Sequence, residues 1–369
     1  MRKFRAAFAV FLVFLIVVSI SGCLGGEKVK EKASSVIESQ IEEQTSSEES
    51  YTTPTEETTT GGGGYTTESP TETETGEYAS WANPWDAYNS VEIDGQSYLI
   101  SYVKYRLRIR TEEGGPIYEY EVEKKRGPAK IHVYGMKINM ETGEQEKTDL
   151  GEFDVYEYYG KITPINGKDM NTTFEFKIWV KQRTEDSDLF FLFPTLEFAT
   201  IYYNLYAGSG NAVGVWIKYG DKEFAFYSPA AVGEMSVAPY QEGDLNMFSD
   251  IPDIEDMYVG WYSMYYFGFW SALAEEDIYH ATQDSWGIMG WQYNYEINPD
   301  GTITLGGKDF KVSNVKWNYS FGGATGQGEA TIAANLPIPI EAKGVFIEQQ
   351  SGTNVFMHIK IEELGFEKL

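Results

Sequence analysis

The chain has 369 residues, of which 29 are Lys or Arg and 56 are Asp or Glu, so its formal net charge at pH 7 is −27. An excess of carboxylates of this size argues against a nucleic-acid partner, because phosphates are bound by Lys and Arg. The sequence has one cysteine, so no disulfide can form within the chain and the folded part must be held by its core.

The N-terminus is predicted to be an export signal that ends in a lipid-attachment site. Cationic residues among the first five precede an uncharged apolar run at 6–20, which is shorter than the roughly 20 residues of a membrane-spanning helix. Ile20-Ser21-Gly22-Cys23 follows and resembles the lipobox of prokaryotic lipoproteins. The resemblance implies that 1–22 is a signal peptide and that Cys23 carries lipid, with the protein on the extracytoplasmic face of the cell membrane. An ordinary signal peptide or an uncleaved anchor helix is the alternative.

Residues 23–80 are predicted to form a lipidated, disordered stalk rich in Ser, Thr and Glu. The stretch 27–80 contains 13 Glu and 3 Lys, and its few apolar residues cannot offset the conformational entropy lost on folding. A flexible chain of this length reaches on the order of 40 Å, so it would hold a folded domain away from the membrane. The lipobox and the Thr-rich stalk together resemble archaeal cell-surface lipoproteins.

Residues 81–369 are predicted to form one β-rich extracellular domain, because alternating stretches recur between turn signals. The clearest hairpin joins 98–110 to 117–123. Its solvent face would pair Lys104/Glu123, Arg106/Glu121 and Arg108/Glu119, and its apolar face Val103/Val122, Tyr105/Tyr120 and Leu107/Tyr118. The glutamates favour a structural interpretation of the basic row over a nucleic-acid or anionic-lipid surface. The predicted fold is a large antiparallel β-sandwich, or a curved sheet or half-barrel, with one buried aromatic-rich helix.

A weak internal repeat is visible within this domain. Residues 93–105 align with 305–317 at a fixed offset, and Gly95/Gly307, Val103/Val315 and Lys104/Lys316 are identical. A duplicated β unit would explain the similarity, and so would chance between two segments that each join a turn to a strand.

The predicted helix covers Met257–Ala274, which is uncharged, rich in Tyr, Trp and Phe, and bounded by acidic residues. A helix that is apolar all round is buried in a core or in a membrane. The acidic flanks disfavour insertion into a bilayer, so we expect a core helix cradled by the sheet. The second interpretation is the wall of an apolar ligand cavity lined by Trp261, Tyr265, Phe269 and Trp270, and the third is contact with the membrane.

No catalytic motif and no metal site stands out in the sequence. Glu276 and Asp284, four residues before and after His280, would share one face of a helix with it, next to Asp277, and could hold Zn²⁺ or Ca²⁺, but acidic surface helices often show this spacing. Acidic stretches at 185–188 and 250–256 could hold Ca²⁺ and equally resemble solvated loops. We therefore assign no cofactor, with Ca²⁺ as the one candidate, and no catalytic residue.

Two N-x-S/T sequons, at Asn171 and Asn318, are candidate N-glycosylation sites in the exported part. The expected function is that of a lipid-anchored surface protein with a binding or envelope-structural role, and not that of an enzyme. Its expected partners are the membrane, through the lipid on Cys23, and a hydrophobic ligand, a glycan or an envelope protein. The alternative is an exported carboxylate-dependent hydrolase or a carbohydrate-binding protein that acts on surface glycans.

Overall fold

A computed structural model describes residues 90–110, 113–166, 172–183, 191, 211–243, 277–288, 291–321, 323–348 and 353–369. These residues all belong to one compact unit, Gly76–Leu369. Several sequence predictions lie outside the described residues: the signal peptide, Cys23 and its stalk, the sequon at Asn171, and the aromatic helix with Trp261, Tyr265, Phe269 and Trp270.

The described residues are almost entirely β, which confirms the predicted class. The strands are β1 (Val91–Ile93), β2 (Gln96–Arg110), β3 (Tyr118–Ile138), β4 (Gln145–Asn166), β5 (Phe174–Val180), β6 (Ala212–Tyr219), β7 (Lys222–Tyr227), β8 (Ala238–Gly243), β9 (Thr282–Ile288), β10 (Trp291–Leu305), β11 (Lys308–Phe321), β12 (Ala324–Ile332), β13 (Glu341–Glu348) and β14 (Thr353–Lys368). A short 3-10 turn, η2 (Pro229–Val232), joins β7 to β8. In the described part of the chain, no helix is long and apolar enough to cross a membrane.

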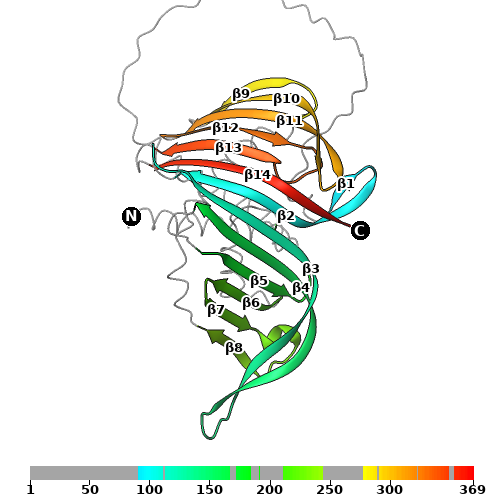
Figure 1. Cartoon of the computed structure of the whole chain (residues 1–369), viewed down its shortest axis with the longest axis vertical. Coiled ribbons are helices and arrows are strands. Elements are labelled where there is room, and N and C mark those ends of the chain that lie inside the picture. The colour runs from blue at the N-terminus through cyan, green and yellow to red at the C-terminus, as the bar shows by residue number, and fades with distance from the viewer. Residues whose placement is uncertain are drawn as a thin grey trace, which may run out of the picture. The chain divides into compact units, whose positions relative to one another are not determined.

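All fourteen strands belong to one antiparallel sheet (Figure 1). One path through it runs β9-β10-β11-β12-β13-β14-β2-β3, and β1 pairs with β2. From β3 the pairing continues through β4, β5, β6, β7 and β8, and β8 then pairs with β3 again. The six strands β3–β8 therefore form a closed ring of hydrogen-bonded neighbours, and the remaining strands extend from it as an open sheet.

The ring closes because β3 is long enough to pair with two different strands, β2 and β8, along one edge. β3 pairs with β2 as far as Lys125, then runs beside β4 alone, and finally meets β8. The closing contact consists of two residue pairs, Gly135↔Pro239 and Met136↔Ala238. We call this contact the seam.

The β2–β3 hairpin tests the predicted register. The charged pairs Lys104/Glu123, Arg106/Glu121 and Arg108/Glu119 are Cα partners as expected. The apolar pairs were wrong by two residues, since Tyr105 lies opposite Val122, Leu107 opposite Tyr120 and Ile109 opposite Tyr118. A hairpin has a single register, which determines the partners on both of its faces. The register that pairs the charged residues as predicted therefore makes the predicted apolar pairs diagonal neighbours and not direct partners.

Alternation along the strands builds the core, as in β2, where Val103, Tyr105, Leu107 and Ile109 are all buried. They belong to a large cluster of buried side chains that extends from β1 to β14. A smaller cluster gathers Val133, Val155, Trp179, Val213 and Ala231, which come from the ring and from η2.

The two segments of the weak repeat have the same local geometry. Ile93 pairs with Gln96 across Asp94-Gly95, and Leu305 pairs with Lys308 across Gly306-Gly307. All four turn residues have positive φ between 52° and 71°, as a type I′ turn requires. Beyond each turn, buried residues lie three apart where alternation slips, at Ile100 and Val103 and at Val312 and Val315. The duplication itself remains a prediction.

Candidate functional site

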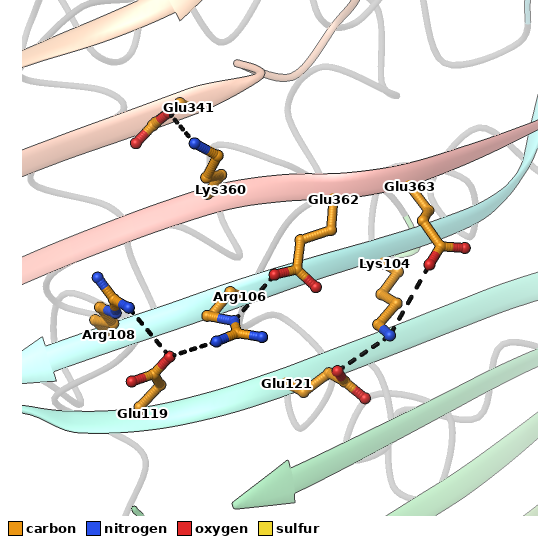
Figure 2. Close-up of polar contacts among 9 residues, drawn as sticks. All are labelled: Lys104, Arg106, Arg108, Glu119, Glu121, Glu341, Lys360, Glu362 and Glu363. Atoms are coloured by element: carbon orange, nitrogen blue, oxygen red, sulfur yellow. Dashed lines mark hydrogen bonds and ion pairs between the residues drawn. The ribbon is translucent and has the colours of Figure 1, made fainter. Parts of the chain in front are cut away.

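The basic row of β2 is held by carboxylates from both neighbouring strands (Figure 2). Lys104 Nζ lies 3.1 Å from Glu121 and 4.0 Å from Glu363. The guanidinium of Arg106 lies 3.0 Å from both Glu119 and Glu362, and that of Arg108 lies 3.3 Å from Glu119. The acidic partners come from β3 and β14. Lys104, Arg106 and Arg108 therefore each have an anion beside them, so these three cations offer no surplus positive charge to a phosphate backbone.

Most of these ion pairs are diagonal. Arg106 lies opposite Glu121 in the register but contacts Glu119, and Lys104 lies opposite Glu123 but contacts Glu121. Diagonal neighbours in a twisted sheet are within reach of long side chains. On β13 and β14, Glu341 contacts its diagonal neighbour His358 at 2.7 Å and its direct cross-strand partner Lys360 at 3.0 Å.

This network makes the stability of the sheet sensitive to acid. Burial raises the pKa of Glu119, but the hydrogen bonds from Arg108 and Arg106 outweigh burial, so its pKa lies below the ordinary value. The pKa of Glu341 is lowered in the same way: burial raises it, but the hydrogen bonds from His358 and Lys360 lower it by more. A carboxyl with a depressed folded-state pKa contributes stability above its unfolded pKa of about 4.3, and loses that contribution as pH falls through the folded value.

We expect Glu119→Gln to lower the free energy of unfolding at pH 7 by about 1 kcal/mol and to have a much smaller effect at pH 3. Urea unfolding of both proteins at the two pH values measures the difference. Glu92→Gln, which removes an exposed carboxyl of β1, is the control and should change the free energy of unfolding equally at the two pH values. An equal effect of Glu119→Gln at pH 7 and pH 3 would show that the charge of Glu119 does not stabilise the sheet.

Each histidine has a carboxylate beside it. His132 Nδ1 lies 3.1 Å from Asp149, and His280 contacts Asp277 at 2.5 Å. The predicted helical face around His280 was wrong, because β9 begins at Thr282 and Asp284 lies in that strand. Within the described ranges, no three His, Cys, Asp or Glu side chains gather closely enough to hold a metal ion. The acidic stretches at 185–188 and 250–256 lie outside those ranges.

The ring carries a row of stacked aromatic side chains. Trp179, Gly214, Tyr227 and Tyr240 are consecutive cross-strand partners on β5, β6, β7 and β8. Because Gly214 has no side chain, Trp179 and Tyr227 stack with their centroids 5.9 Å apart and their planes at 10°. Tyr240 stacks on Tyr227 in turn, at 6.5 Å and 20°. Since these ring faces cover one another, the row is not an open platform for a sugar.

Lys147 of β4 connects this aromatic row to the β3–β4 hairpin through direct contacts. Its ammonium lies 4.6 Å from the ring centroid of Tyr240 and 4.3 Å from that of Tyr134, and it pairs with Glu242 at 2.9 Å. The hydrogen bond to Glu242 raises the pKa of Lys147 to about 12. Cation–π contacts of exposed groups contribute roughly 0.5–1 kcal/mol each, so the cluster supports the nearby seam.

Two buried cations lie at the point where β3 leaves β2. Lys124 and Arg126 follow Tyr120 and Val122 on the core-facing side of β3, and their exposed fractions are 1% and 6%. The Nε of Arg126 donates a hydrogen bond of 2.8 Å to the carbonyl oxygen of Ile100, just beyond the last β2–β3 pair. Among the described residues, these are the only charged side chains that are buried. We call this pair the fork cations.

An aromatic ring lies beside each of the fork cations. Lys124 lies 5.7 Å from the ring centroid of Tyr105, and the guanidinium of Arg126 lies 4.7 Å from that of Phe191. Both cations make further contacts. Sequence reasoning missed this site because it ended the strand at Glu123. The signal was present, since the inward positions of the alternating pattern continue through 124 and 126.

No protein-family model matches the chain, and no curated protein matches it. Among solved structures, it is similar to a DUF1329 family protein from Desulfovibrio piger, with 9% sequence identity over 77% of this chain and 92% of that one. The TM-score of this superposition is 0.21. A value of that size does not establish a shared fold.

Proposed function

We propose that the chain is a lipid-anchored protein of the extracytoplasmic face of the cell membrane, whose β domain binds a ligand and does not catalyse a reaction. Cys23 would carry the lipid, and 23–80 would be the tether. The ligand would have an apolar body and an acidic group. The observation that carries this proposal is the placement of the fork cations on the aromatic, core-facing side of the sheet.

The low dielectric of a protein interior strengthens the attraction between a buried cation and a neighbouring anion. Lys124 and Arg126 are two residues apart on one strand face, so their Cα atoms lie about 7 Å apart, and the like charges of their side chains repel each other. An acidic group near both would lower this repulsion. The apolar and aromatic side chains of the same face suit a hydrocarbon body.

A fatty acid and an alcohol of equal chain length test the acidic group directly. We expect the full-length protein to bind palmitate at least about tenfold more tightly than hexadecanol, since a charged hydrogen bond contributes about 1.5–3 kcal/mol. Lys124→Met should reduce that preference. Lys125→Met is the matched control, because Lys125 is the next residue, faces solvent and pairs with Glu123 at 3.8 Å.

Titration calorimetry in a detergent that does not compete measures both affinities, and circular dichroism verifies that each variant is folded. Equal affinity for acid and alcohol in the unmodified protein would overturn the acidic-group assignment without any variant. Binding of neither probe, together with hydrolysis or binding of a surface polysaccharide, would favour the exported hydrolase or carbohydrate-binding protein. The anchor is tested separately, by the mass of the lipid on the peptide that begins at Cys23.

A further inference from the structure

The exposed face of strands β9–β12 carries a row of uncharged hydrogen-bonding side chains. Ser285, Asn294, Asn318 and Gln327 are consecutive cross-strand partners, and all four are exposed. We call them the amide row. The four strands lie side by side at one end of the sheet (Figure 1). The next row toward the β9–β10 and β11–β12 turns is also uncharged and contains Gln292, Ser320 and Thr325.

The amide row differs from the rest of this face. The row on its other side is charged, with Glu296, Lys316, Glu329 and Lys343 as consecutive partners, and Lys343 forms an ion pair with Glu329. Farther along, β13, β14, β2 and β3 carry the network of Figure 2. Uncharged donors and acceptors match the hydroxyl groups of a sugar, which can donate and accept in the same way.

Asn318 stands in the middle of the amide row and opens the sequence Asn318-Tyr319-Ser320, which is an N-glycosylation sequon. Its Oδ1 accepts a hydrogen bond of 2.8 Å from the Nδ2 of Asn294. Its Nδ2, the atom that bears the sugar in a glycosylated asparagine, is not engaged by any described residue. Ser320 lies on the same face of β11, and Tyr319 between them is 5% exposed and packs into the core.

We propose that Asn318 carries an N-linked glycan whose first sugars lie along the amide row and cover the face of β9–β12. In the transfer, Nδ2 of Asn318 attacks C1 of an oligosaccharide carried on a polyprenyl phosphate. The bond from C1 to nitrogen forms, the bond from C1 to the phosphate oxygen breaks, and the amide proton leaves to the departing phosphate. Because Tyr319 is buried in the finished sheet, transfer precedes the folding of β11.

This inference rests on the proposed extracytoplasmic location, because the lipid-linked donor is used outside the cytoplasm. The test is peptide mass spectrometry of the full-length protein from membranes of its own host. We expect the Asn318 peptide to carry a hexose-containing mass, which Asn318→Gln and Ser320→Ala abolish and Ser320→Thr retains. Asn294 is the internal control, since it neighbours Asn318 on the exposed face but is followed by Tyr295-Glu296 and forms no sequon.

The outcomes separate the two proposals. A lipid on Cys23 with an unmodified Asn318 peptide would overturn the glycan and leave the anchored location intact. An unprocessed chain without lipid on Cys23 would overturn the proposed location. A glycan that survives in Ser320→Ala would show that the sequon does not direct it, which also overturns the inference.

Discussion

Replacing Gly328 with alanine is expected to lower the free energy of unfolding by about 3 kcal/mol, because the new methyl group has no room. Gly328 of β12 lies between Trp317 of β11 and Gly344 of β13. A Cβ at 328 would lie 2.4 Å from Cζ2 of Trp317 and 2.4 Å from the carbonyl oxygen of Lys343. The indole of Trp317 also covers Gly344, where a Cβ would lie 2.9 Å from Cη2.

The indole is 3% exposed and belongs to the main core cluster, so it cannot move aside without disturbing its neighbours. Relief would require β12 and β13 to separate, because the second obstacle is backbone. Guanidinium unfolding followed by tryptophan fluorescence measures the loss. Gly127→Ala is the control, since a Cβ there has nothing within 4 Å, and it should cost little. Equal unfolding midpoints for the two variants would refute the close packing of Trp317 on glycine.

The sequence predicted the strands best where one face is buried and the other is charged. Where β2 and β3 pair, from Val103 to Ile109 and from Tyr118 to Lys124, the alternation is regular, and the charged pairs set the correct register. The role of Gly328 was not predictable from local pattern. A glycine that makes room for a tryptophan of the neighbouring strand cannot be distinguished from a turn glycine until the strand pairing is known. The two hairpin turns, by contrast, have a local cause in the positive φ that Asp94-Gly95 and Gly306-Gly307 adopt.

The candidate sites also differ in whether a local motif or the long-range pairing of strands reveals them. Asn318 was found because a sequon is a local motif, whereas its place in the amide row depends on the pairing of four strands. The fork cations were missed because the predicted strand ended at residue 123, before Lys124 and Arg126. Their burial follows from β3 continuing past the end of its pairing with β2, which is a long-range property of the sheet.

Replacing Gly135 with valine is expected to open the seam while leaving the open part of the sheet folded. Even a Cβ at 135 would lie 2.2 Å from Cγ1 of Val237 and 3.0 Å from Cγ of Pro229, and the valine adds two further methyl groups. Only two residue pairs close the ring here, and one of them contains Pro239, which has no N–H to donate. The seam is therefore the weakest connection in the ring, and a clash there separates β8 from β3.

Hydrogen exchange followed by mass spectrometry measures this opening. A local loss of about 2 kcal/mol would accelerate exchange of the β8 amides about 30-fold. Peptides from β10–β14 should be unchanged, because β8 is not paired with those strands. Lys147→Met should act in the same direction but less strongly, since it removes the ion pair with Glu242 and both cation–π contacts and adds no clash. Gly127→Ala lies in the same strand without a clash and should leave β8 protected. If exchange in Gly135→Val rose equally in β8 and β12, the ring and the open sheet would unfold as one unit, and the seam would be no weaker than the strand pairs beside it.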